Sequence, residues 1–206
     1  SAAKSAYVVE FSPLDDRELY TWLSSRFKRA GKSISRDVAD QLKFRAGTDL
    51  TRLDGEADKL IAHAGERGEI LPEDLDVVTP TLECTIFQLI DDLVAHNGAG
   101  AYRRLAIMHD GGEDDVRVLA MITRQMRFMA HIKLMQAKRV RDDEIIKALG
   151  INPYGLRNTR RQLGAFTEER LERAYRDCVD AEYAIKSGAM SDEEALGRLM
   201  LNWLNS

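Results

Sequence analysis

Apolar residues recur at helical spacing along most of the chain. The first clear stripe places four large side chains on one face of a helix: Leu19, Trp22, Leu23 and Phe27. Asp15 precedes this stripe, and Glu18 lies three residues after Asp15, which is the spacing of a capping box. The sequence therefore predicts a helix that begins just after Asp15 and ends near Gly31.

Two further helices are predicted before residue 79. Ser35 is a suitable N-cap for a helix that ends near Gly47. Thr48 or Asp49 can cap the next helix, which carries an apolar face as far as Ile61. Together with the first helix, these segments predict a compact three-helix lobe.

The segment Thr79-Pro80-Thr81 is the predicted boundary between two domains. Beyond it the apolar pattern resumes at Ile86, in a helix that Asn97-Gly98 is expected to close. The longest predicted helix runs from Glu113 to about Lys138. Apolar residues lie nearly all round this helix, so we expect it at the centre of a bundle. Ser191 and Glu194 form a second capping box, which begins the final helix.

Strand signals are almost absent from the sequence. The single extended segment is Tyr7 to Phe11, and no interval from Asp15 onward resembles a sheet. The predicted fold class is therefore all-α. We expect a small three-helix domain over residues 1–79, followed by a larger helical bundle over residues 80–206.

Composition limits the classes of function. The 206 residues carry a net charge of -4, which predicts no bulk affinity for nucleic acid or an acidic membrane. No apolar run approaches the roughly 20 residues that span a bilayer, so we expect a cytoplasmic protein without membrane contact. Cys84 and Cys178 are distant in sequence and outside any CxxC spacing, which favours reduced thiols.

Motifs for catalysis or metal binding are also missing from the sequence. No two of the four histidines lie at the i, i+4 spacing of a zinc helix, and neither a phosphate-binding glycine loop nor a GxSxG elbow occurs. The acidic pairs Asp91-Asp92, Asp114-Asp115 and Asp142-Asp143 fit solvated helix starts better than a catalytic dyad. We therefore expect no catalytic residues, no metal and no cofactor.

Positive charge is concentrated in one part of the sequence. Between Arg124 and Arg161, ten basic residues face only three acidic ones, which gives this segment +7 while the rest of the chain carries -11. This asymmetry indicates an acidic protein surface or a nucleic-acid backbone as partner, and a solvated arginine-rich face is the alternative. Because aromatic residues are sparse among these cations, protein assembly is favoured over base stacking.

Short motifs follow one another in a characteristic order. In the first domain they are Val9 to Leu14, Trp22, Asp49-Leu50, Glu56, Lys59-Leu60 and Glu69 to Asp74. In the second they are Ile86 to Asp92, Leu119 to Arg127, Ile151 to Tyr154 with Gln162 and Phe166, and Asp180 with Ile185 to Gly188. In this order they resemble the delta subunit of bacterial DNA polymerase III over nearly the whole chain. Ser187 stands where the family usually has threonine.

The resemblance implies a non-catalytic role in a clamp loader, a bacterial replication complex belonging to the polymerase holoenzyme. Residues 1–79 would be the lid-type domain of an AAA+ protein. Residues 80–206 would be the collar, which packs against the ATPase (tau/gamma) subunits and delta prime. The N-terminal AAA+ domain of the family is expected to be absent from this chain. The sliding clamp would then be reached only through that missing domain, and DNA contact would be indirect.

The resemblance also suggests a partner-binding rim on the collar, built from part of the basic segment. The candidate residues are Arg124, Gln125, Arg127, Tyr154, Arg157, Arg160 and Arg161. For Gln125 and Tyr154, packing inside the domain is an equally good interpretation. For Lys186 and Gly188, a helix C-terminus is the better interpretation, because glycine accepts left-handed geometry and lysine faces the negative end of the helix dipole.

Two other functions remain open from the sequence. A helical DNA-binding regulator would use Ser35 to Ile61 as a helix-turn-helix, but its second helix would carry four acids against Arg52 and Lys59, the wrong sign for phosphate contact. The second alternative is the lid and collar of another AAA+ clamp-loader subunit. Arginines placed to sense nucleotide would distinguish such a subunit from delta.

Overall fold

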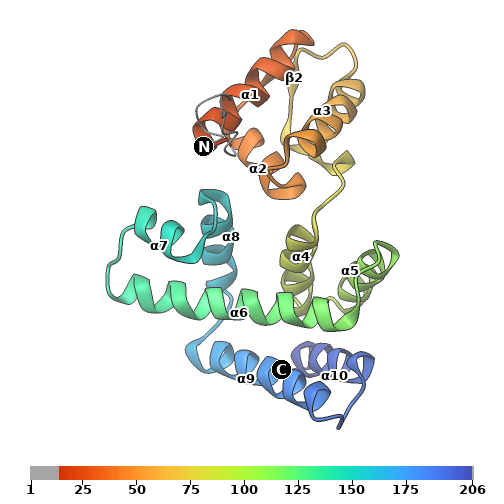
Figure 1. The fold of residues 1–206 in the computed structure, drawn as a ribbon, viewed down its shortest axis with the longest axis vertical. Helices are drawn as coiled ribbons and strands as arrows, with labels where there is room; N and C mark the ends of the chain where they lie inside the picture. Colours follow the sequence, from red (N-terminus) through yellow and green to blue (C-terminus); the bar gives the residue numbers. More distant parts are fainter. Residues whose placement is uncertain (1–13, 206) are drawn as a thin grey trace, which may run out of the picture. The chain divides into compact units, whose positions relative to one another are not determined.

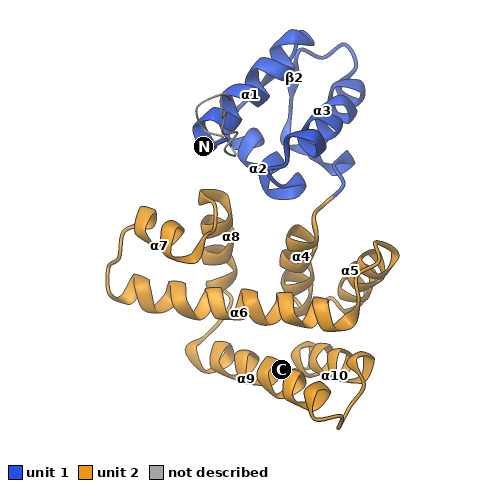
Figure 2. Cartoon of the chain, in the orientation of Figure 1, with its two compact units in different colours: residues 1–79 blue, residues 80–206 orange. Residues whose placement is uncertain are grey.

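The computed structural model of the protein describes residues 14–205, so the extended segment expected at Tyr7 to Phe11 lies outside the described residues. The chain divides into two compact units between Thr79 and Pro80 (Figure 2). Both units are built almost wholly from helices, which confirms the all-α fold class. Each unit is described by itself below.

Unit 1 contains three α-helices, one short 3-10 helix and two very short strands within residues 14–79 (Figure 1). In chain order these are α1 (Asp16–Arg29), β1 (Ser33–Ile34), α2 (Arg36–Ala46), α3 (Leu50–Ala64), β2 (Glu69–Ile70) and η2 (Pro72–Val77). Leu23, Phe27, Leu42 and Leu60 are completely buried and form the centre of the unit. The three predicted helices are therefore held together by one shared apolar core.

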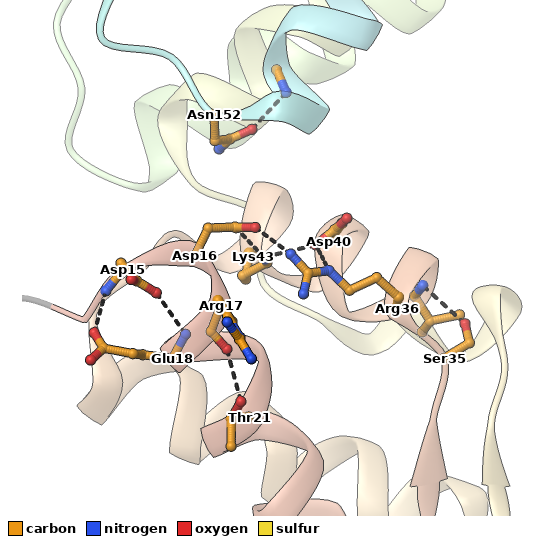
Figure 3. A network of polar contacts seen from close by, with 12 residues as sticks. Asp15, Asp16, Arg17, Glu18, Thr21, Ser35, Arg36, Asp40, Lys43 and Asn152 are labelled. Carbon is orange, nitrogen blue, oxygen red and sulfur yellow. Dashed lines mark hydrogen bonds and ion pairs between the residues drawn. The ribbon is translucent and has the colours of Figure 1, made fainter. Parts of the chain in front are cut away.

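The helix starts in unit 1 follow the capping residues. The backbone N–H of Glu18 donates to Asp15 Oδ1 at 2.7 Å, and the N–H of Asp15 donates to Glu18 Oε2 at 2.8 Å, which confirms the capping box (Figure 3). Ser35 caps α2, and of the two candidates for α3 it is Asp49 that accepts from the backbone, at 2.8 Å. These side chains satisfy N–H groups that the first turn leaves without partners.

The two strands correct one expectation. β1 and β2 pair in parallel, with Ser33 opposite Glu69 and Ile34 opposite Ile70, so the prediction of no sheet after Asp15 was wrong at these four residues. Ile34 and Ile70 are both buried in the core of unit 1. The pairing thus arises from packing of residues distant in sequence, and a two-residue strand is too short to produce an alternating pattern.

A cluster of four charges joins α1 to α2 (Figure 3). Lys43 is only 5% exposed and forms ion pairs with Asp16 and with Asp40, the latter at 2.7 Å. Arg36 pairs with the same two carboxylates. A buried ammonium group is tolerated only when it is paired, so these carboxylates make the position of Lys43 possible.

Unit 2 contains seven helices within residues 80–205. They are α4 (Leu82–Val94), α5 (Gly98–Asp110), α6 (Asp115–Ala137), α7 (Asp142–Leu149), α8 (Pro153–Leu163), α9 (Glu168–Lys186) and α10 (Asp192–Leu204). Figure 1 shows α4, α5, α7 and α8 on one side of α6, with α9 and α10 on the other. Contacts with α4, α7, α8, α9 and α10 confirm α6 as the central helix.

The core of unit 2 has a main part and a smaller part along α6. The main part gathers side chains from α4, α6, α9 and α10, including Leu89, Ile122, Met126 and Leu199. The smaller part consists of Ile132, Ile145 and Leu156, where α6 meets α7 and α8. Cys84 and Cys178 are both buried, and burial raises the pKa of Cys178 to about 12. None of the helices within residues 14–205 is long and apolar enough to cross a membrane.

The end of α4 differs from the expectation that Asn97-Gly98 would close it. The helix stops at Val94, and His96 follows with a positive φ of 54°. Asn97 instead caps α5, because its Oδ1 accepts the backbone N–H of Gly100 at 3.1 Å. Asparagine serves at helix starts as well as ends, which explains the wrong assignment.

At the end of α9, Gly188 has φ +73°, which confirms the expected C-terminal glycine.

Candidate partner-binding surface

The seven residues expected at a partner interface lie on two helices of unit 2 that contact each other. Those on α6 are Arg124, Gln125 and Arg127, and those on α8 are Tyr154, Arg157, Arg160 and Arg161. Two adjacent helices therefore supply the whole candidate set. The individual side chains, however, have very different surroundings.

The outer face of α6 carries two arginines of the set, Arg124 and Arg127. Arg124, Arg127, His131 and Leu134 share one helix face by their spacing. Arg127 and His131 are exposed and Leu134 is 63% exposed, whereas Arg124 is half-buried with its guanidinium 4.9 Å from the Phe128 ring centre. Arg127 makes no hydrogen bond or ion pair with the part of the chain that the structure describes. The positive charge of Arg127 therefore lies on the same helix face as the exposed apolar side chain of Leu134.

Gln125 faces the opposite way, into the unit, and is only 4% exposed. Its Nε2 donates to Gln162 Oε1 at 3.0 Å and to Thr159 Oγ1 at 3.3 Å. Thr159 in turn donates to the carbonyl of Gly155 at 2.9 Å. Gln125 thus makes its side-chain hydrogen bonds within unit 2, between α6 and α8.

Gln162 extends this network to α4. Its Nε2 donates to the carbonyl of Phe87 at 2.9 Å and to Asp91 Oδ1 at 2.8 Å. The second oxygen of Asp91 accepts from Arg161 Nη2 at 2.9 Å. Asp91 was expected to be a solvated helix residue, and its side chain is 43% exposed while it also links α8 to α4. Because a buried polar group needs partners, the network fixes how these three helices meet.

Arg160 is neutralised within the unit. Its two terminal nitrogens donate to the two oxygens of Asp142 at 2.8 and 2.6 Å, a bidentate pair between α8 and the start of α7. The hydrogen bonds from Arg160 hold the pKa of Asp142 below its ordinary value, and Asp142 raises the pKa of Arg160. Both side chains line a groove between α7 and α8 whose apolar part includes Ile146 and Leu156.

Tyr154 and Arg157 lie together on the first turn of α8. The Arg157 guanidinium is 5.1 Å from the centre of the Tyr154 ring, a cation–π arrangement. The turn itself is fixed by Asn152, whose Oδ1 accepts the backbone N–H of Gly155 at 2.6 Å (Figure 3). An aromatic ring and a cation are thereby held in one defined position at the start of the helix.

The arrangement of these side chains on α6 and α8 is better suited to binding a partner than to catalysing a reaction. Arg160 and Arg161 are bound to carboxylates, Gln125 is buried, and Arg127 is exposed without a hydrogen bond or ion pair to the described part of the chain. No group of three metal-binding side chains gathers anywhere in residues 14–205. Sequence reasoning missed the exposed Leu134, although its position seven residues after Arg127 could have indicated the shared face.

Comparison with known proteins assigns the family. Residues 83–203, more than half of the chain, match the family described as DNA polymerase III delta subunit, C-terminal domain. The chain belongs to the DNA polymerase III delta subunit family. The resemblance stated from the sequence motifs is thereby confirmed. The matched residues cover nearly all of unit 2, including both helices of the candidate surface.

Two relatives extend the comparison to unit 1. The DNA polymerase III subunit delta of Bacillus subtilis (strain 168) is 24% identical over 199 residues, which cover 96% of this chain and 57% of that protein. The solved Bacillus subtilis DNA clamp loader delta protein has a TM-score of 0.72 at 23% identity, over 99% of this chain and 60% of the other. The second match shows a shared fold. The chain spans less than two thirds of either relative.

Proposed function

We propose that this chain is the non-catalytic scaffolding part of a delta subunit in a clamp loader, the complex that places a sliding clamp on DNA during replication. The observation that carries the proposal is the family match over residues 83–203. Helical bundles commonly associate through helix faces with apolar and charged side chains, and the outer face of α6 has this character. The chain needs no catalytic groups for such a role.

The two units would have different functions within the clamp loader. Unit 1 would be the lid-type domain, and unit 2 would be the collar that binds the ATPase (tau/gamma) subunits and delta prime. The chain spans 57% and 60% of the two relatives, and their remaining length would include the N-terminal AAA+ domain that the resemblance implies and that would contact the sliding clamp. Contact of this chain with DNA would then be indirect.

Within unit 2, we assign the partner contact to the outer face of α6 and the first turn of α8. Arg127 and Arg124 would meet acidic side chains of the partner, and Tyr154 with Arg157 would supply an aromatic contact. Gln125, Arg160 and Arg161 would act indirectly, because their hydrogen bonds hold α4, α6, α7 and α8 in position.

Native mass spectrometry of the chain mixed with the ATPase subunits and delta prime tests this assignment. The variant Arg124→Glu/Arg127→Glu should bind at least about tenfold more weakly than the wild type, because like charges would face each other across the interface. The matched control is Arg103→Glu/Arg198→Glu, which changes the net charge equally at exposed arginines of α5 and α10. Normal assembly of the first variant would contradict the assignment of the α6 face. Failure of the wild-type chain to assemble, together with salt-sensitive binding to duplex DNA, would contradict the clamp-loader role.

A further inference from the structure

Glu56 and Lys59 belong to the sequence motifs of unit 1 but not to the candidate surface on α6 and α8. Both lie on α3, three residues apart, so their side chains are neighbours on the helix. Glu56 is 5% exposed, and together with Lys43 and Asp74 it is one of three buried charged residues among residues 14–205. Because a buried carboxylate is costly unless donors satisfy it, the partners of Glu56 indicate its role.

The partners of Glu56 are Lys59 and Thr79, the last residue of unit 1. Lys59 Nζ donates to Glu56 Oε1 at 2.9 Å, and the backbone N–H of Thr79 donates to Glu56 Oε2 at 3.2 Å. Lys59 Nζ also donates to Thr79 Oγ1 at 3.0 Å. Arg52 Nη2 donates to the carbonyl oxygen of Thr79 at 3.1 Å. The N–H, the hydroxyl and the carbonyl of Thr79 are therefore all bound by side chains of α3.

The residues on either side of Thr79 are also held, each by its own unit. Val78 is 4% exposed and belongs to the core of unit 1. Thr81 caps α4, because its Oγ1 accepts the backbone N–H of Cys84 at 3.2 Å. Pro80 is the single residue between the end that α3 holds and the start of α4. Proline fixes its own φ and restricts the residue before it to extended conformations, so this connection is short and stiff.

We propose that Glu56 positions the connection between the two units, because it holds Thr79 against α3 and thereby confines bending to Pro80. Without this carboxylate, the N–H of Thr79 loses its acceptor and Lys59 loses the partner that holds it beside Thr79. The flexible part of the connection then grows from one residue to two. This role does not require the proposed clamp-loader function.

The alternative is that these contacts only stabilise the fold of unit 1. The exposure of the residues favours positioning, because Thr79, Arg52 and Lys59 all lie at the surface. Hydrogen bonds and ion pairs at exposed sites contribute little to the free energy of folding. Three side chains of one helix that bind a single exposed residue therefore do more to fix the position of that residue than to stabilise the unit.

Pulsed dipolar EPR spectroscopy of the 206-residue chain tests the proposal. Spin labels at Lys28→Cys on α1 and Glu193→Cys on α10 report the range of distances between the units, since both positions are exposed. The native Cys84 and Cys178 are buried, so the label reacts with them slowly. Glu56→Ala should widen the distance distribution by about 1.4-fold, the square-root growth of a flexible connection that lengthens from one residue to two.

Further variants separate the loss of the anchor from a loss of folding. Arg52→Met/Lys59→Met removes two exposed donors without changing a buried group, and it should also widen the distribution. Glu56→Gln keeps one oxygen for the N–H of Thr79 and should give an intermediate width. Asp58→Asn is the matched control and should leave the width unchanged, since this exposed carboxylate of α3 forms its ion pair with α1.

A second pair of labels, at Arg17→Cys and Glu66→Cys, lies within unit 1 at exposed positions. Its distance distribution should remain unchanged in every variant. The proposal is overturned if both Glu56→Ala and Arg52→Met/Lys59→Met leave the distribution between the units unchanged, or if the control widens it equally. Equal widening of the pair within unit 1 would also overturn it, because the contacts would then serve the folding of unit 1 and not the connection.

Discussion

Single residues in unit 2 show how a polar side chain can determine the packing of helices. Gln162 is 3% exposed, and its amide makes three hydrogen bonds, to Gln125, to the Phe87 carbonyl and to Asp91. Leaving a buried donor or acceptor without a partner costs more than the hydrogen bond contributes when formed. The position of α8 against α4 and α6 therefore depends strongly on this one side chain.

Replacing Gln162 with alanine should lower the free energy of unfolding by about 1–3 kcal/mol, because Gln125 and Asp91 would lose a buried partner. Urea denaturation followed by circular dichroism measures this difference. Gln136→Ala is the control at an exposed position of α6 and should change stability by less than about 0.5 kcal/mol. Equal effects of the two substitutions would show that the network contributes nothing beyond surface contacts.

The Asp142–Arg160 pair predicts a pH dependence. Its hydrogen bonds from Arg160 lower the pKa of Asp142 below the ordinary 3.8, so the folded state favours the charged form. The stabilisation is complete above the unfolded pKa and disappears as the pH falls through the lower folded value. Asp142→Asn should therefore be less stable than wild type at pH 7, and this difference should shrink below about pH 4.

Urea midpoints measured at pH 7 and pH 3 test this prediction. Glu144→Gln removes an exposed charge of the same first turn that has no ion pair in the described chain, so it serves as the control. A stability difference for Asp142→Asn that stays constant between the two pH values would contradict the pKa shift.

At the scale of elements, the caps determine where helices begin. Ser191 starts α10: its Oγ accepts the N–H of Glu194 at 3.2 Å, and its own N–H donates to Glu194 Oε2 at 3.0 Å. The motif is local, so the sequence sufficed to predict it. The same reasoning correctly predicted Asp15 and Ser35.

Ser191→Ala should destabilise the protein by about 1 kcal/mol, the usual cost of removing a serine cap. Hydrogen exchange of the first turn of α10 should increase at the same time, because the N–H of Glu194 loses its acceptor. Ser187→Ala is a useful comparison, since Ser187 lies at the end of a helix and donates to the carbonyl of Ala184. An equal loss of stability from the two substitutions would contradict a specific capping role for Ser191.

Features that depend on distant residues could not be predicted. The strands β1 and β2 pair across more than thirty residues, and Gln125 meets Gln162 across 37. The segment from Arg124 to Arg161 has a large excess of positive charge in sequence, yet Arg161 pairs with Asp91, which lies 70 positions away. Periodicity and capping report on local structure, whereas burial of Gln125 and neutralisation of Arg161 are decided by tertiary contacts. The structure was therefore needed to show which of the candidate residues are exposed on the surface of unit 2.

At the scale of the whole molecule, each unit has an apolar core of its own. Residues 80–206 expressed alone should therefore unfold in one cooperative transition, with strong helical circular dichroism. Thermal denaturation monitored at two wavelengths tests this expectation. The 206-residue chain is the reference, and a fragment without a cooperative transition would contradict the independence of unit 2.

We propose that unit 2 is the assembly module of a clamp-loader delta subunit. The most direct measurement is native mass spectrometry of residues 80–206, mixed with the clamp-loader ATPase subunits and delta prime. We expect a stable complex that contains the fragment, and at least about tenfold weaker binding of the Arg124→Glu/Arg127→Glu variant. A folded fragment that remains a free monomer, while the full chain enters the complex, would contradict this claim and assign assembly to residues 1–79.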